Sequence, residues 1–397
     1  MKNESPKYRY DKFNENWIIV KLSDIACHYK TGGTPSTKDP TFWGGAIPWI
    51  QSSDIQKDSL FGVIPQKFIS EEGLQNSTAK LIPKNSIAIV TRVGVGKLAI
   101  IDQDYTTSQD FLSLSDFNGD TQFIAYSIYR MLQKESTQLQ GTSIKGITKE
   151  DLLSKKISLP EIEEQSAIGS LFRTLDNLLS SYKDNLANYQ SLKATMLSKM
   201  FPKAGQNVPE IRLDGFEGEW ENSKISDYVY LLNGRAFKQD ELLNEGKYRV
   251  VRVGNFNTNE KWYYSNLELE ENKYANKDDL LYLWATNFGP EIWKEEKIIF
   301  HYHIWKLEFD RSIIDRNYLY YWLEKDKKRI QQNTNGSTMV HVTKSMMENR
   351  EFLFPMFREQ QAIGTYFSNL DSLITAHQEK ISQLETLKKK LLQDMFI

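Results

Sequence analysis

The sequence GTSIKGITKEDLLSKKISLPEIEEQSAIGSLFRTLDNLLSSYKDNLANYQSLKATMLSKMF, residues 141–201, is repeated without a gap as residues 336–396 at an offset of 195. The two copies have 18 identities in 61 positions, far more than chance gives. A second match, at an offset of 203, begins each half of the chain. Its identical residues are Pro6, Arg9, Asp11, Phe13, Trp17, Lys21, Ser23 and Asp24, which recur as Pro209, Arg212, Asp214, Phe216, Trp220, Lys224, Ser226 and Asp227. A repeat this long indicates a duplicated domain-plus-helix unit with pseudo-two-fold symmetry rather than a solenoid.

The end of each copy predicts a long helix. Pro160 and Pro355 each end a short apolar strand, and apolar residues then recur at spacings of three and four over about five heptads. The first helix, residues 163–200, would be about 57 Å long at 1.5 Å per residue. One copy alone would fit an ordinary bundle helix. Two copies on either side of a variable segment favour two antiparallel helices that pack on each other and hold the variable segments at a fixed distance.

Composition places few limits on function. The net charge of −2 does not indicate a nucleic-acid-binding protein, so any DNA binding must depend on locally arranged groups. The single cysteine, Cys27, excludes an internal disulfide framework and is expected to lie in the core. No apolar stretch approaches the roughly 20 residues of a membrane helix. Together with the polar N-terminal sequence, these features predict a soluble cytoplasmic protein.

The variable segments are expected to form small mixed-sheet domains with exposed polar loops. Gly94, Gly96 and Lys97 resemble a phosphate-binding loop, but Thr91 occupies the position of the first glycine, so a turn between strands is expected instead. His301 is two residues from His303, and both are expected to lie on one side of a strand, where they would contact bases. Without a nearby cysteine or carboxylate at ligand spacing they make a poor zinc site.

Motifs for catalysis are missing from the sequence. It has no Asn/Asp-Pro-Pro-aromatic motif for amino-group methylation, no glycine-rich cofactor loop after a strand, no Walker pair and no carboxylate–lysine nuclease cluster. The chain is therefore predicted not to be an enzyme.

Several segments resemble the specificity subunit of type I restriction-modification systems. They are ISLPEIEEQSAIGSLFRTLD, EFLFPMFREQQAIGTYFSNLD, VPEIRLDGFEGEW and the GGTPST…FWGGAIPWI…SSDI beginning of the first variable segment. The most specific features are the twin Glu-Gln pairs, Glu164-Gln165 and Glu359-Gln360, each preceded by a Leu-Pro or Phe-Pro step. The resemblance covers essentially the whole chain.

The resemblance implies an α+β protein with two mixed-sheet target-recognition domains in a pseudo-two-fold arrangement, joined by two long antiparallel helices that form a coiled coil. Residues 1–160 and 202–355 would be the recognition domains, and residues 161–201 and 356–397 the helices. Each domain would read one half of a bipartite DNA target. The helices would set the spacing and dock two methyltransferase subunits, and restriction subunits would join the complex. AdoMet, ATP and Mg would be bound by these partners, and this chain would hold no cofactor or metal.

Loop residues whose side chains suit base or phosphate contacts are the candidate DNA readers. They are Thr34, Ser36, Thr37, Lys38, Arg92, Lys97, Ser108 and Gln109 in the first variable segment, and Arg235, Arg252, Asn287, Lys294, His301 and His303 in the second. A solvated basic turn is the alternative for Arg92 and Lys97. For the whole chain the alternative is a coiled-coil scaffold that binds only proteins, and a stand-alone methyltransferase or nuclease is disfavoured by the missing motifs.

Overall fold

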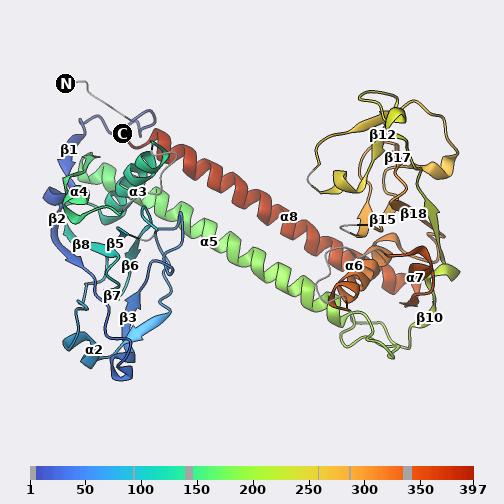
Figure 1. Ribbon diagram of the computed structural model, residues 1–397, viewed down its shortest axis with the longest axis horizontal. Helices are drawn as coiled ribbons and strands as arrows, with labels where there is room; N and C mark the ends of the chain where they lie inside the picture. Colours follow the sequence, from blue (N-terminus) through green and yellow to red (C-terminus); the bar gives the residue numbers. More distant parts are fainter. Residues whose placement is uncertain (1–5, 93, 139–145, 258, 286–287, 334–341) are drawn as a thin grey trace. The chain divides into compact units, whose positions relative to one another are not determined.

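The computed structural model describes residues 6–92, 94–138, 146–257, 259–285, 288–333 and 342–397. The chain divides into two compact units, which we call unit 1 (Met1–Asn185 with His377–Ile397) and unit 2 (Leu186–Ala376). Each unit contains one variable segment and part of both long helices, so each is built from both halves of the repeat (Figure 1).

The two predicted long helices are α5 (Ile162–Lys199) and α8 (Phe357–Asp394). Each follows a short strand and a proline, as predicted: β9 (Lys156–Leu159) precedes α5, and β19 (Glu351–Phe354) precedes α8. In unit 1 the beginning of α5 packs against the end of α8, with the rings of Phe172 and Phe396 5.4 Å apart. In unit 2 Lys193, near the end of α5, forms an ion pair with Asp371 in the first half of α8. The predicted antiparallel packing is therefore present within each unit.

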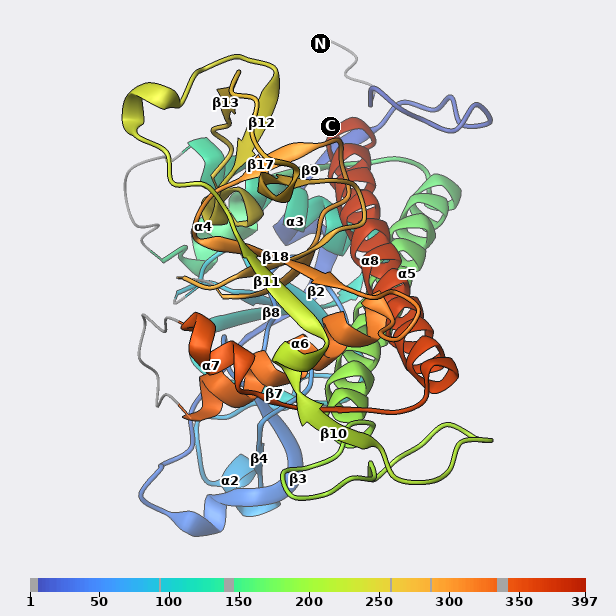
Figure 2. The same cartoon turned by 90° about the vertical axis from the view of Figure 1, so that its right-hand side faces the viewer.

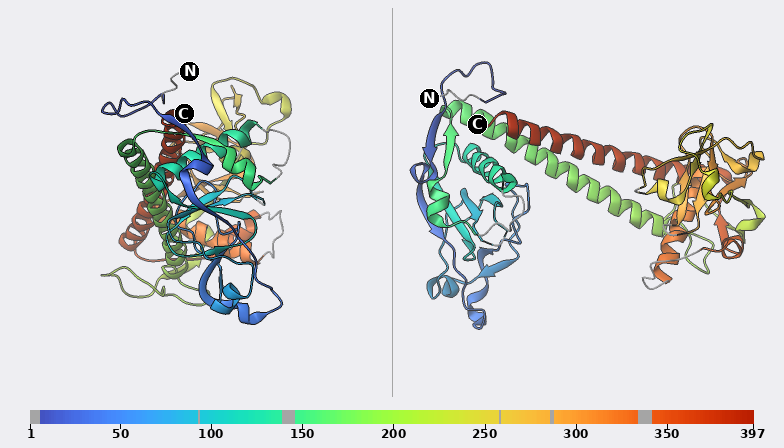
Figure 3. Two further views of the ribbon diagram at one scale, coloured as in Figure 1. Left: turned by 90° about the vertical axis from the view of Figure 1, so that its left-hand side faces the viewer. Right: turned by 45° about the horizontal axis from the view of Figure 1, so that its top comes forward.

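Unit 1 contains a four-stranded antiparallel sheet in the order β2-β8-β5-β6, a three-stranded sheet in the order β4-β3-β7, and the pair β1-β9. Its further elements are β1 (Ile18–Lys21), α1 (Leu22–Ile25), β2 (Ala26–Thr31), η1 (Pro40–Phe42), β3 (Trp43–Ile50), β4 (Lys67–Ile69), α2 (Glu71–Gln75), β5 (Ser86–Val90), β6 (Leu98–Ile101), β7 (Thr106–Thr107), β8 (Phe111–Phe117), α3 (Thr121–Gln138) and α4 (Lys149–Ser154). Helix α3 packs against β5 and β6 (Figure 3).

Unit 2 contains sheets in the orders β11-β18-β15-β16 and β13-β12-β17-β14, and the pair β10-β19. Figure 2 shows β11 beside β18, and β12 with β13 and β17. Its elements are β10 (Glu221–Lys224), η2 (Ile225–Asp227), β11 (Val229–Asn233), η3 (Gln239–Glu241), β12 (Tyr248–Val251), η4 (Val253–Phe256), β13 (Tyr263–Ser265), η5 (Glu271–Lys273), β14 (Tyr274–Ala275), β15 (Leu280–Leu283), β16 (Gly289–Ile292), β17 (Ile298–Phe300), β18 (Ile304–Phe309), α6 (Arg316–Asn333) and α7 (Lys344–Glu348).

The two variable segments share one topology although their sequences do not match. Taken in chain order, β2, β3, β4, β5, β6, β7 and β8 correspond to β11, β12, β13, β15, β16, β17 and β18. The equivalent pairs β3–β7 and β12–β17 are both parallel. Strand pairing is made by backbone groups, so very different side chains can occupy the same ladder. The α+β fold class with mixed sheets is confirmed.

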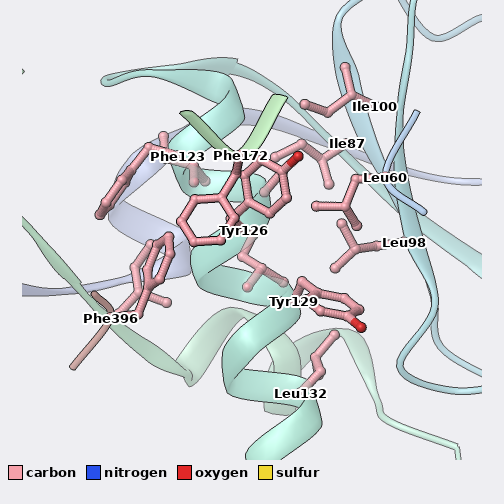
Figure 4. Packing of buried hydrophobic residues seen from close by; sticks show 14 of the residues in the cluster. Leu60, Ile87, Leu98, Ile100, Phe123, Tyr126, Tyr129, Leu132, Phe172 and Phe396 are labelled. Carbon is pink, nitrogen blue, oxygen red and sulfur yellow. The ribbon is translucent and has the colours of Figure 1, made fainter. Parts of the chain in front are cut away.

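Helix α3 is the centre of the unit 1 core (Figure 4). Phe123 and Tyr126 face Phe172 of α5 and Phe396, which follows α8, while Tyr129 faces the sheet residue Leu98. All six side chains are buried. Each contributes about 1.5–3 kcal/mol through removal of apolar surface from water. This packing joins the β2-β8-β5-β6 sheet to both long helices.

Two sequence-based expectations about position are wrong. Cys27 is exposed, because β2 lies at the edge of its sheet and leaves this side chain in solvent. His301 and His303 lie in the turn between β17 and β18, where Ile304 N donates to His301 O at 2.9 Å, and not on one strand face. A three-residue reversal separates two strands that the sequence reads as one. The turn expected at Gly94 and Lys97 is confirmed between β5 and β6.

Within the described residues, no helix is long and apolar enough to cross a membrane.

Candidate nucleic-acid interface

A buried ion pair fixes the start of each long helix. In unit 1, Arg9 donates from Nε to Glu164 Oε1 at 2.8 Å and from Nη2 to Oε2 at 2.6 Å. In unit 2, Arg212 donates to the two oxygens of Glu359 at 2.8 and 2.7 Å. Both glutamates are fully buried. A buried carboxylate needs such a bidentate partner, so these paired residues serve the fold.

The glutamines of the Glu-Gln pairs link each helix to a neighbouring turn. Gln165 Nε2 donates to Pro160 O at 2.8 Å, and its Oε1 accepts from Asp120 N at 3.0 Å. Gln360 repeats both bonds, donating to the carbonyl of the equivalent proline and accepting from Asp315 N at 2.9 Å. The side chains of Asp120 and Asp315 in turn accept from backbone N–H groups in the first turns of α3 and α6. The motif therefore aligns α3 with α5 and α6 with α8.

A further repeated contact joins the two long helices within each unit. In unit 1, Asp176 of α5 accepts from Tyr126 Oη at 2.6 Å and pairs with Lys388 of α8. Burial raises the pKa of Tyr126, and the neighbouring Asp176 carboxylate raises it further, so the hydroxyl stays protonated as a donor. In unit 2, Asp371 of α8 accepts from Tyr321 Oη at 2.7 Å and pairs with Lys193 of α5.

Two candidate readers of unit 1, Arg92 and Gln109, line the same cleft of about 320 Å³. Thr31, Thr148 and Lys149 line it too. Sequence reasoning missed Thr148 and Lys149, although this Thr-Lys pair is identical in the repeat as Thr343-Lys344. Arginine, lysine, glutamine and threonine in one cleft provide the donors and acceptors that base edges and phosphates require.

The other unit 1 candidates lie outside the residues that line this cleft. Thr34 is half-buried, whereas Ser36, Thr37 and Lys38 are exposed in the loop between β2 and β3. The indole of Trp43 fixes that loop by donating to Ser36 O at 3.0 Å.

Lys97 and Ser108 are engaged in contacts within the protein. Lys97 Nζ donates to the backbone carbonyls of Ser52 and Ile55 at 3.2 and 3.0 Å. Ser108 is buried beside Asp110. These contacts give both residues a structural role in the turns that they occupy.

In unit 2 the structure brings Arg235 and His301 together. Arg235 N donates to Phe300 O at 3.0 Å, and Tyr302 N donates to Arg235 O at 3.0 Å. A Cβ at Gly234 would lie 2.3 Å from His301 O, so only glycine permits this approach. Arg235 also pairs with Glu241. The backbone of the β17–β18 turn thus sets the position of the Arg235 backbone, and Glu241 holds its guanidinium.

The β17–β18 turn presents a row of rings. The ring centroids of His301 and His303 are 5.1 Å apart, and that of Trp284 is 4.9 Å from that of His303. Burial lowers the pKa of His301 to about 4, with smaller contributions from His303 and Arg252, so His301 is neutral at pH 7. The neutral His301 imidazole and the aromatic ring of Trp284 provide hydrogen bonds and stacking surface rather than charge.

Three unit 2 candidates remain. Arg252 lies directly after β12, with its guanidinium 5.5 Å from the ring centroid of Tyr263. Lys294 is exposed two residues after β16. Asn287 lies outside the described residues. Sequence reasoning missed Tyr302, which is partly exposed between the two histidines; the aromatic run from His301 to Trp305 was the available signal.

No group of three or more His, Cys, Asp or Glu side chains in the described part of the chain could hold a metal ion.

Comparisons with known proteins identify the family to which both halves of the repeat are similar. The model of a family described as "Type I restriction modification DNA specificity domain" matches residues 14–188 and 217–386. The MjaIX specificity subunit of Methanocaldococcus jannaschii is 22% identical over 96% of this chain and 93% of its own length. The EcoR124I/EcoR124II specificity subunit of Escherichia coli is 32% identical over 45% of this chain and 48% of its own length.

The fold is also similar to that of a solved structure. The S subunit of a type I restriction-modification system from M. genitalium superposes with a TM-score of 0.66 at 16% identity, over 99% of both chains. With two matches to the family model covering most of its length, the chain belongs to the family of type I restriction-modification specificity subunits.

Proposed function

We propose that this chain reads a bipartite DNA target, with unit 1 reading one half-site and unit 2 the other. One observation supports this most strongly. The two units repeat the same strand order and the same buried frame contacts, yet the surfaces that they offer differ. Unit 1 offers the cleft of Arg92 and Gln109, and unit 2 offers the turn of His301 and His303. Two like frames with unlike surfaces suit a target made of two unlike half-sites.

In this proposal α5 and α8 set the half-site spacing. Each helix has 38 residues, about 57 Å at 1.5 Å per residue, and each contributes residues to both units. Half-sites that are read on one face of a duplex are about 34–36 Å apart per helical turn. The same helices would dock two methyltransferase subunits, one on each half of the repeat, and restriction subunits would join through the complex.

Catalysis is assigned to those partners. AdoMet would be bound by the methyltransferase subunits, and ATP and Mg by the restriction subunits, while this chain supplies the DNA sequence recognition. The complex would act on DNA in the cytoplasm.

The decisive experiment purifies the chain with its methyltransferase partner and maps N6-methyladenine in cells that carry both. The proposal expects a bipartite methylated motif, and replacing residues 17–140 with those of another family member should change only one half of it. Methylation that does not change with this exchange, or a complex that binds all duplexes equally, would support a scaffold that binds only proteins.

The spacing role has its own test. Deleting four residues in register from each helix, within residues 180–191 and 375–386, shortens each by about 6 Å. We expect the gap between half-sites to shift by one or two base pairs. An unchanged gap would show that the helices do not set it.

A further inference from the structure

Unit 1 has a second cavity, of about 280 Å³, formed by α3, β9 and the residues that follow α8. It is lined by Trp17, Ser127, Arg130, Met131, Lys134, Glu135, Lys156, Ile157, Ser158, Phe396 and Ile397. Arginine and lysine side chains outnumber the single acidic residue, Glu135, which already pairs with Lys155. The cavity therefore favours a negatively charged occupant.

Three hydrogen-bond donors in this cavity are unused. Trp17 Nε1, Ser127 Oγ and Arg130 Nε are buried and have no hydrogen-bond partner among the described residues. Ser127 is only 6% exposed, so its hydroxyl has little access to solvent. Burial lowers the pKa of Arg130, and no ion pair within the described part of the chain compensates for it. Buried donors without acceptors are costly, and an acceptor with two oxygens would satisfy them.

The surface beside the cavity is apolar. Ile18 and Ile19 of β1 are 61% and 69% exposed, and Ile19 lies opposite Ser158 of the cavity wall in the β1–β9 ladder. This sheet has two strands, so β1 has a free edge within the described structure. Exposed isoleucines on a free edge suit an extended peptide and do not suit a phosphate backbone.

Unit 2 has the equivalent cavity, of about 290 Å³, but there the basic side chain at the position of Arg130 has an acceptor within the protein. Lys325 replaces Arg130 and donates to Pro202 O at 2.6 Å. Trp322 replaces Ser127, and β10 carries Glu221 and Asn222 where β1 carries its two isoleucines. The indole Nε1 of Trp220, the equivalent of Trp17, also lacks a partner among the described residues. An unpartnered arginine and serine beside an apolar edge are found in unit 1 but not at the equivalent place in unit 2.

We propose that the unit 1 cavity binds a carboxylate side chain of an acidic, aliphatic segment of a partner protein, which lies along β1. Arg130, Ser127 and Trp17 donate to the carboxylate, and the aliphatic residues of the segment cover Ile18 and Ile19. Since unit 2 lacks the site, each specificity subunit takes one such segment. The site does not depend on DNA reading.

Calorimetric titration of the full chain with a blocked Leu-Glu-Leu-Glu-Leu peptide tests the proposal, with the Leu-Gln-Leu-Gln-Leu peptide as the neutral control. We expect binding of the acidic peptide alone, weakened about tenfold or more by Arg130→Gln through loss of a charge-assisted bond. The matched variant Lys325→Gln in unit 2 should leave the affinity unchanged. Circular dichroism verifies folding, and if Arg130→Gln does not fold, Ser127→Ala, which removes another of the proposed donors, replaces it, with a smaller loss of affinity expected.

Several results would overturn the proposal. If the neutral peptide binds as tightly as the acidic one, the contact is purely apolar. If Lys325→Gln weakens binding as much as Arg130→Gln does, the peptide does not bind specifically at the unit 1 cavity. Sodium acetate binding with the same affinity as the peptide would identify a small-anion site. Competition by a random duplex, lost in Arg130→Gln, would assign the cavity to a DNA phosphate.

Discussion

Unit 1 and unit 2 share one frame, by which we mean the common strand order and the repeated buried contacts, but they present different surfaces. Both place a buried glutamate against an arginine from the segment before the recognition sheet, and both join α5 to α8 through an aspartate, a tyrosine and a lysine. Between these contacts the sequences differ, and so do the surfaces. The difference teaches that buried charge and helix packing preserve sequence, whereas strand order needs only backbone pairing and tolerates almost any side chain on an outer face.

The largest expected effect comes from the frame ion pairs. Arg9→Ala leaves Glu164 buried and unpaired, and Arg212→Ala does the same to Glu359. Each change should lower the free energy of unfolding by about 3–5 kcal/mol, measured by urea denaturation. Hydrogen exchange should show the loss in the unit that carries the change. Equal loss of protection in both units would contradict their separate frames.

The buried His301 should make unit 2 the more acid-sensitive unit. Its folded pKa of about 4 lies below the ordinary 6.5, so the unfolded chain binds the proton first. The effect of His301 on the free energy of unfolding is absent above pH 6.5. It grows as the pH falls from 6.5 towards 4, lowering the stability, and is constant below pH 4. The loss is at most about 3 kcal/mol.

Urea denaturation between pH 7 and pH 4 measures this loss, and His301→Gln isolates it from the carboxylates. A variant with the same pH dependence as the parent would show that His301 is not responsible.

The tyrosine contacts provide a matched pair of smaller size. Tyr126→Phe removes the donor to Asp176, and Tyr321→Phe removes the donor to Asp371. A hydrogen bond to a charged group is worth about 1.5–3 kcal/mol, and each lysine partner remains, so we expect losses near the lower figure. Thermal unfolding should show similar decreases for the two variants. A much larger effect in one unit would mean that the frames are not equivalent.

The last expected effect is on the free energy of DNA binding at the proposed reading surfaces, and it leaves the free energy of unfolding unchanged. Arg92→Ala should weaken binding by about 1–3 kcal/mol for duplexes with the unit 1 half-site, and Arg252→Ala for duplexes with the unit 2 half-site. Competition binding with each half-site altered in turn measures this. If the loss of binding free energy is the same whichever half-site is altered, these arginines contact phosphates and not bases.

The sequence alone predicted much of the frame. Apolar residues at spacings of three and four after Pro160 and Pro355 predicted both long helices, and the start of the first helix was predicted to within one residue. This was possible because the buried face of an amphipathic helix follows from the spacing of its apolar residues in the sequence. The offset of 195 predicted the duplication and, with the Glu-Gln pairs, the family. The wrong expectations for Cys27 and His301 arose where neighbours in space decide: an edge strand exposes one residue, and a short turn divides an apparent strand.

What the sequence determined by itself is therefore the repeat, the helices and the family, since each depends on local periodicity or on identity between two copies. Tertiary structure alone decided that the unlike variable segments share one strand order, that Arg92 meets Gln109 in a cleft, and that Arg130 lacks the internal acceptor that Lys325 has. The physical reason is that strand pairing and the satisfaction of buried donors join residues far apart in the chain, and no local pattern records which partners they find.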